Sequence, residues 1–150
     1  MCIRDRLKFA YYIKCENVIK DESGEIIEIH CSYDPNTKGG MSEDGRRVRG
    51  TLHWVSSQEC IEAEVRLYDR LFISDNPENN GDFIDDLNPG SLSVIKKAKL
   101  ETSLSTASNE TIYQFERTVY FIKDSKDSNN NNLIFNRAVS LRDSWARLNR

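Results

Sequence analysis

Two histidines and four cysteines are the residues whose chemistry would most readily reveal a catalytic or metal site in this chain. The cysteines, at positions 2, 15, 31 and 60, show no Cys-x-x-Cys spacing. With only two histidines beside them, they indicate neither a zinc site nor a disulfide framework. His53 has no serine, cysteine or carboxylate at the spacing of a general base and its partner. The sequence therefore predicts free thiols in a reducing cytoplasm, no bound metal and no catalytic residue.

Basic side chains gather in three short segments of a chain whose net charge is −3. Three arginines lie in 44–50, three lysines in 96–99 and four arginines in 137–150, whereas 75–86 holds five carboxylates and no basic residue. Local positive patches on an acidic background suit one nucleic acid in one pose, and disfavour general coating of DNA or RNA. Charge by itself, however, indicates an ordinary solvated surface.

The length of 150 residues suits one compact domain or two small barrels that share an interface. Hydrophobic residues make up 38% of the chain and charged residues 30%, as in ordinary globular proteins. No apolar run approaches the roughly 18 residues of a membrane span. Residues 1–6 lack the apolar core of a secretion signal, and we expect them to be a non-native leader before a domain at 7–150.

Short strands separated by turn signals dominate the chain. We expect them at 9–20, 26–31, 48–55, 63–73, 91–100, 111–123 and 133–142. A turn at 21–24 should join the first two as a hairpin, and 82–87 should form a short helical segment capped from 79–82. This pattern predicts an all-β fold, as an antiparallel barrel or a pair of barrels.

Two groups of side chains in these strands have structural interpretations. Alternation places His53 and Trp54 on opposite faces of their strand, which predicts Trp54 in the core and His53 as a hydrogen-bonded structural residue. A second group is expected to form a polar network that fixes strand register, and comprises Arg66, Tyr68, Asp69 and Arg70.

Four ordered blocks of sequence carry a family resemblance. They are Asp44–Ser56 (DGRRVRGTLHWVS), Glu64–Phe72 (EVRLYDRLF), Tyr113–Arg117 (YQFER) and Phe135–Trp145 (FNRAVSLRDSW). Together they resemble the C-terminal anticodon-binding region of glutaminyl-tRNA synthetase, over nearly all of 7–148. The resemblance implies antiparallel β-barrels of the class I glutaminyl/glutamyl type, here incomplete at the N-terminal side. Its implied partner is the anticodon loop of tRNA(Gln).

The resemblance also implies roles for four residues. Gln114 and Arg117 would line the pocket for the middle anticodon base and its phosphate. An amide offers a donor and an acceptor to a splayed-out base, and a guanidinium suits a phosphate. Lys8, and less securely Arg6, would contact the first anticodon base. In one regular strand Gln114 and Arg117 would face opposite sides, so a bulge or strong twist is needed for both to reach one nucleotide.

Neither ATP-binding signature of class I synthetases, His-Ile-Gly-His or Lys-Met-Ser-Lys, occurs in the sequence. The resemblance therefore implies a chain inactive by itself, whose parent ligase uses ATP and Mg²⁺ through a catalytic domain in cis. Two alternatives stay open. One is the related barrel of a glutamyl-tRNA synthetase, and the other is a non-catalytic module that binds RNA or protein.

Overall fold

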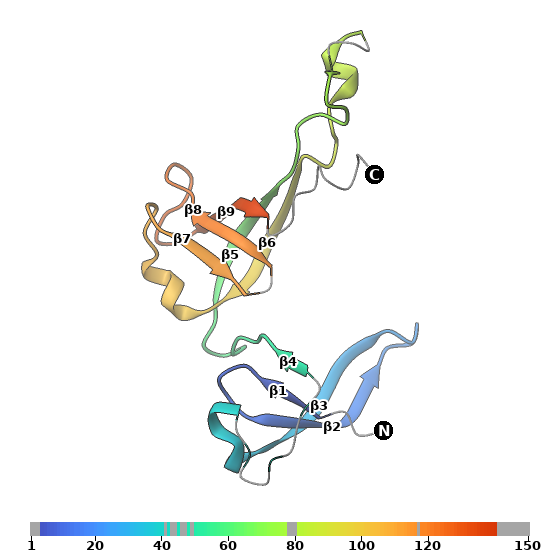
Figure 1. The fold of residues 1–150 in the computed structure, drawn as a ribbon, viewed down its shortest axis with the longest axis vertical. Helices are drawn as coiled ribbons and strands as arrows, with labels where there is room; N and C mark the ends of the chain where they lie inside the picture. Colours follow the sequence, from blue (N-terminus) through green and yellow to red (C-terminus); the bar gives the residue numbers. More distant parts are fainter. Residues whose placement is uncertain are drawn as a thin grey trace. The chain divides into compact units, whose positions relative to one another are not determined.

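Strands are the main regular secondary structure of the computed structural model, which describes residues 4–40, 42, 45, 48, 50–77, 81–116 and 118–140 (Figure 1). The chain divides into two compact units, Met1–Trp54 and Val55–Arg150. The prediction of an all-β fold is confirmed. Within the described ranges, no helix has the length and apolar character needed to cross a membrane.

A four-stranded sheet forms the first unit. Its strands are β1 (Arg4–Leu7), β2 (Tyr12–Lys20), β3 (Ile26–Asp34) and β4 (Gly50–Leu52), in the order β3-β2-β1-β4. The predicted hairpin is confirmed as β2–β3, which pair antiparallel. Its turn is held by the Asp21 carboxylate, which accepts hydrogen bonds from the backbone N–H groups of Ser23 and Glu25, each at 2.9 Å. β1 includes residues 4–6 of the expected leader, whose origin stays a prediction.

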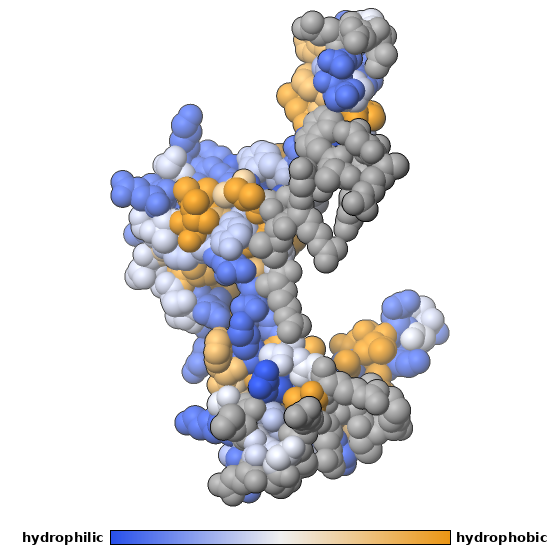
Figure 2. Space-filling view, viewed as in Figure 1, coloured by the Kyte–Doolittle hydropathy of each residue, from blue (hydrophilic) through white to orange (hydrophobic). Residues whose placement is uncertain are grey.

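The first unit buries few side chains. Among its described residues only Tyr12 and Thr37 are buried. Thr37 lies in the 3₁₀ segment η1 (Pro35–Gly40), where its hydroxyl accepts from the backbone N–H of Tyr12 at 2.9 Å and donates to the carbonyl of Asp34 at 2.7 Å. Hydrophobic side chains are exposed along the hairpin, where Figure 2 shows an orange patch. The exposed residues of the hairpin include Val18, Ile26, Ile27 and Ile29. This sheet therefore keeps much apolar surface in contact with water.

A five-stranded sheet forms the second unit. Its strands are β5 (Ile61–Tyr68), β6 (Leu92–Leu100), β7 (Ile112–Phe115), β8 (Val119–Lys123) and β9 (Leu133–Ser140), in the order β6-β5-β9-β8-β7. Its core contains an aromatic cluster. The rings of Phe115 and Phe121 stack with centroids 4.2 Å apart, and Phe135 lies 5.7 Å from Phe115. Phe121 and Phe135 are almost completely buried.

Each described sheet is open, whereas the sequence indicated barrels. The first and last strands of each sheet pair with one neighbour only. In the second sheet these are β6 and β7, which do not pair with each other. The chain leaves β6 through the 3₁₀ segment η4 (Thr102–Thr106) and crosses to the opposite edge before β7 begins. In both sheets a parallel pair, β1–β4 or β5–β9, joins segments distant in sequence.

The segment expected as one strand at 111–123 is instead the hairpin β7–β8. Its turn includes a hydrogen bond from the backbone N–H of Thr118 to the carbonyl of Phe115 at 2.9 Å. An extended strand would separate Phe115 and Phe121 by about 20 Å, at roughly 3.3 Å per residue. The turn brings both rings into the same core, and burial of two aromatic side chains favours it.

Other strands are shorter than predicted, because β4 ends at Leu52 and β5 ends at Tyr68. The helical segment expected at 82–87 is confirmed as the 3₁₀ segment η3 (Phe83–Asp86), with the predicted cap. The Asp82 carboxylate accepts a hydrogen bond from the backbone N–H of Ile84 at 3.0 Å. The 3₁₀ segments η1 and η4 were not predicted.

Candidate functional site

The turn between β1 and β2 holds Lys8, the first of the predicted binding residues, in a fixed backbone position. Its backbone N–H donates to the carbonyl of Leu52 at 2.9 Å, and its own carbonyl accepts from the indole N–H of Trp54 at 3.0 Å. The backbone N–H of Leu7 donates to the carbonyl of Tyr11 at 2.9 Å, which closes the base of the turn. These bonds order the turn before any ligand arrives.

Phe9 is the outermost residue of this turn, and sequence reasoning missed it. Its side chain is 85% exposed, and its φ of 59° is the one positive value among the described non-glycine residues. A bulky residue in this region is uncommon and strained, and such strain often marks functional sites. The ammonium of Lys8 lies 5.1 Å from the centroid of the Phe9 ring. The turn therefore presents an aromatic face and a positive charge together.

Arg6 has a structural partner. Its Nε and Nη2 atoms donate to the hydroxyl of Thr51, at 3.2 Å and 2.8 Å. Arg6 and Thr51 are also directly opposite in the parallel pair β1–β4. The guanidinium thus helps to join these two strands, and Arg6 is a weaker candidate for RNA contact than Lys8.

The prediction that Trp54 lies in the core is wrong. Its side chain is 44% exposed, and it lies beyond the end of β4. Because the strand stops at Leu52, the alternation used to bury Trp54 does not extend to it. Its indole N–H instead holds the carbonyl of Lys8, so Trp54 supports the β1–β2 turn. His53 is exposed.

Gln114 lies in β7, at the edge of the second sheet, and its side chain is exposed. Its neighbours Tyr113 and Phe115 pack against the core, so Gln114 points to the other face. Within the described part of the chain, its side-chain amide makes no hydrogen bond, and it is available to a ligand. Arg117 lies outside the described residues. The alternation argument for this pair does not apply, because β7 ends at Phe115.

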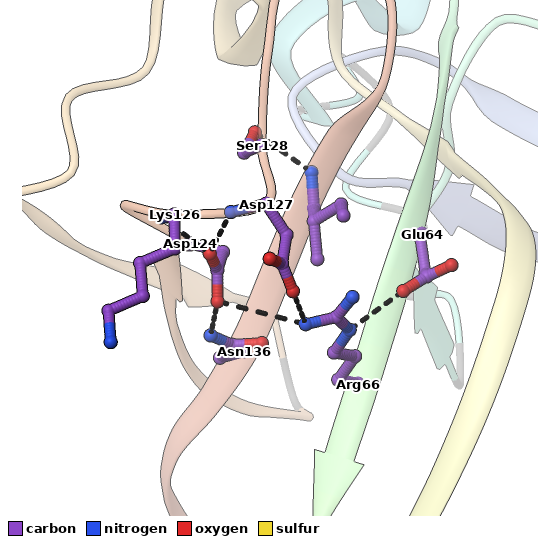
Figure 3. Close-up of polar contacts among 8 residues, drawn as sticks. Glu64, Arg66, Asp124, Lys126, Asp127, Ser128 and Asn136 are labelled. Carbon is purple, nitrogen blue, oxygen red and sulfur yellow. Dashed lines mark hydrogen bonds and ion pairs between the residues drawn. The ribbon is translucent and has the colours of Figure 1, made fainter.

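A polar cluster around Arg66 links strands of the second sheet (Figure 3). The Arg66 guanidinium contacts the carboxylates of Glu64 at 2.7 Å, Asp127 at 2.6 Å and Asp124 at 3.8 Å. Asn136 on β9 donates its amide N–H to Asp124 at 2.6 Å. The cluster therefore connects β5, β9 and the loop that precedes β9. The predicted network had placed Arg66 with residues 68–70, and of these Tyr68 does hydrogen-bond the Arg66 side chain. The further partners are Glu64 on the same strand and two carboxylates of the loop before β9, Asp124 and Asp127.

The carboxyl group of Asp124 has a pKa below its ordinary value. The backbone N–H of Asp127 lowers it most, followed by the Asn136 amide, the backbone N–H of Lys126 and the charge of Arg66. The hydrogen bonds that the guanidinium of Arg66 donates to Asp127 and then to Glu64 raise the pKa of Arg66 above its ordinary value. All these contacts favour the charged forms of both side chains.

A pH dependence of stability follows from Asp124. Its lowered pKa stabilises the folded chain above the unfolded value of about 4, and this stabilisation is lost as the pH falls through the folded pKa. The melting temperature should therefore decrease as the pH is lowered from 6 to 2. In Asp124→Asn the melting temperature should decrease less over the same range. Asp75→Asn is the matched control, since it removes an exposed carboxylate. Equal slopes in the wild type and Asp124→Asn would contradict this assignment.

Comparisons with known proteins show which family these elements resemble. Residues 51–124 match the family described as "tRNA synthetases class I (E and Q), anti-codon binding domain". This part of the chain is similar to that family. The matched range runs from β4 to the end of β8 and includes Gln114. Lys8 and the β1–β2 turn precede it.

Similarity to individual proteins covers more of the chain. It is 50% identical over 143 residues to a glutamine–tRNA ligase of Stutzerimonas stutzeri (strain A1501), covering 93% of this chain and 26% of the relative. It is 52% identical over 141 residues to that of Aliivibrio fischeri (strain MJ11), covering 94% and 25%. The resemblance to glutaminyl-tRNA synthetase is therefore confirmed. The chain spans about a quarter of the length of these curated relatives.

Proposed function

We propose that this chain is the anticodon-reading part of a glutamine–tRNA ligase, with the anticodon loop of tRNA(Gln) as its partner. The observation that carries the proposal is the identity of 50–52% to glutamine–tRNA ligases over at least 93% of the chain. Within that similarity, the family match identifies the matched segment as an anticodon-binding domain. Such a function belongs in the cytoplasm and involves neither DNA nor a membrane.

The ligation itself belongs to a catalytic domain of the parent enzyme. The 150 residues contain neither ATP-binding signature of the class I synthetases. The similar glutamine–tRNA ligases are about four times longer than this chain. In the proposed parent, that domain binds ATP and Mg²⁺ and joins glutamine to the tRNA. This chain by itself is inactive and contributes recognition, which is coupled to catalysis only when both parts are present.

The proposed contacts divide between the two units. Lys8 contacts the first anticodon base, and Gln114 reads the middle base through its exposed amide. Arg117 binds the adjoining phosphate. Arg6 supports the first contact indirectly, because its guanidinium bonds Thr51 on the neighbouring strand. Sequence-specific recognition of RNA targets unpaired bases of this kind, which are stacked on aromatic rings and bonded along their edges.

Phe9 extends this contact surface by stacking on an unpaired base of the loop. Its ring is exposed, is held on an ordered turn and has the ammonium of Lys8 beside it. Stacking of this type contributes about 1–3 kcal/mol per base. Phe9→Ala should weaken binding of the tRNA(Gln) anticodon stem-loop by that amount, measured by fluorescence anisotropy, while Phe9→Tyr keeps most of the affinity.

Phe83→Ala is the matched control for this prediction, because it removes another exposed ring of the chain, on η3. It should leave binding unchanged. If Phe9→Ala bound the stem-loop as tightly as the wild type, Phe9 would not be a stacking residue.

The proposed function is tested by binding of the 150-residue chain to the tRNA(Gln) anticodon stem-loop and to a fully paired hairpin of equal length, at two salt concentrations. The expected result is tighter binding of the stem-loop, with an affinity that falls as salt rises, because phosphate contacts release counterions. Equal affinity for both RNAs would contradict an anticodon reader.

A glutamyl-tRNA synthetase barrel is the second candidate, because the family description covers the enzymes for both E and Q. The anticodon stem-loop of tRNA(Glu) distinguishes the two in the same assay. Preference for that hairpin would reassign the chain to the glutamate enzyme. A general interaction module would instead bind neither hairpin selectively.

A further inference from the structure

Two cysteines face each other across the hairpin of the first unit. Cys15 on β2 and Cys31 on β3 are direct partners in the antiparallel register, and both thiols are free. Such partners have Cα atoms about 4.5 or 5.5 Å apart. Disulfides join residues whose Cα atoms lie about 4.4–6.8 Å apart. The backbone of this hairpin is therefore already spaced for a disulfide.

The register beside the pair is fixed by side chains on both strands. The hydroxyl of Ser32 on β3 donates to the carboxylate of Glu16 on β2 at 2.7 Å, and the ammonium of Lys14 reaches the same carboxylate at 3.0 Å. The next partners are Asn17 and His30, so Glu16 is an extra residue on β2 and forms a bulge. A bulge increases the local twist and lets Cys15 adjust toward its partner.

The surroundings of the pair set its reactivity. Cys31 is exposed, so a small oxidant in solution reaches it, while Cys15 is partly buried. Desolvation raises the pKa of the Cys31 thiol, and the charges of Cys15, Glu16 and Asp5 raise it further. The thiolate is the reacting form of cysteine. Oxidation of the pair should therefore be slow near neutral pH and accelerate as the pH rises.

We propose that Cys15 and Cys31 form a dithiol–disulfide site that takes a small-molecule disulfide as its oxidant. One cysteine thiolate attacks a sulfur of the oxidant, forms a mixed disulfide and releases one thiolate. The second cysteine thiolate attacks the protein sulfur of that mixed disulfide and releases the other. The cysteines lose two electrons, the oxidant is reduced to two thiols, and the two cysteine protons end on those thiols.

Oxidised glutathione is the probe for the test, with peptide mapping by mass spectrometry as the readout. In the wild type and in Cys60→Ser, the expected product is an intramolecular link between Cys15 and Cys31. In Cys31→Ser, the reaction should stop at a glutathione adduct on Cys15. Separate adducts on both cysteines of the wild type, or a link from either one to Cys2 or Cys60, would overturn the proposal.

A second measurement tests whether the fold brings the cysteines together. In the folded chain the rate of linking should exceed that in concentrated urea by about tenfold or more, because the hairpin holds the thiols close together. Oxidation should also slow amide hydrogen exchange along β2 and β3. Equal rates of linking in the folded and unfolded chains would show that the register does not create the site.

Discussion

Replacing Phe135 by alanine should destabilise the second unit by about 3–5 kcal/mol, since a fully buried aromatic side chain is lost and a cavity is left behind. Phe135 has no exposed surface and lies on β9, in the middle of the five-stranded sheet. Its ring packs 5.7 Å from Phe115 and 6.4 Å from Tyr113. Urea denaturation followed by hydrogen exchange of the β8 and β9 amides would measure the loss in this unit.

Val139→Ala is the matched control, because Val139 lies on the same strand and is 59% exposed. It should change the free energy of unfolding by much less than the Phe135 variant. A similar loss of unfolding free energy in the two variants would contradict a hydrophobic core centred on Phe135. In that case the aromatic cluster would not be the main source of stability of the sheet.

Gln114→Ala should lower the discrimination between the natural middle anticodon base and a changed base by about 1–3 kcal/mol, the usual contribution of a base-specific contact. The amide lies on the exposed face of an edge strand, with no hydrogen bond from the described part of the chain, so its loss should leave the fold intact. Affinity for the natural stem-loop should therefore fall, whereas affinity for the changed stem-loop should stay constant.

Ile112→Ala controls for the loss of side-chain volume on the same face of β7, because Ile112 is two residues before Gln114 and 57% exposed. It should keep the discrimination of the wild type. If Gln114→Ala also kept it, the reading of the middle base would belong to another residue.

Local signals in the sequence predicted several elements correctly. The turn after β2 follows from Asp21 and Gly24, since the aspartate carboxylate binds nearby backbone N–H groups and the glycine adopts a positive φ of 87°. Asp82 likewise caps η3 as expected. In both cases the interacting groups lie within four residues of each other, so the sequence alone contains the interaction.

Features that depend on distant residues were not predictable in the same way. The β7–β8 turn lacks the glycine, proline and asparagine that usually signal turns, and it follows from the shared burial of Phe115 and Phe121. Arg66 bonds Asp127, a partner 61 residues away. No periodicity in the sequence indicates either contact, because each depends on how the strands pair.

In the candidate site, too, local features were predictable from the sequence, and features that depend on the surrounding structure were not. Gln114 was predicted on a strand, and β7 confirms that position. Phe9 was read only as the start of a strand, because neither its positive φ nor its exposure is encoded in the type of residue. Trp54 was expected in the core, and the early end of β4 instead leaves it free to hold the carbonyl of Lys8.

The most direct test of the account is the affinity of the wild-type chain for the tRNA(Gln) anticodon stem-loop and for the same hairpin with its middle anticodon base changed. The natural loop should bind more tightly by about 1–3 kcal/mol, and Gln114→Ala should remove this difference. Equal affinity of the wild type for both hairpins would contradict the proposal that this chain reads the anticodon of tRNA(Gln).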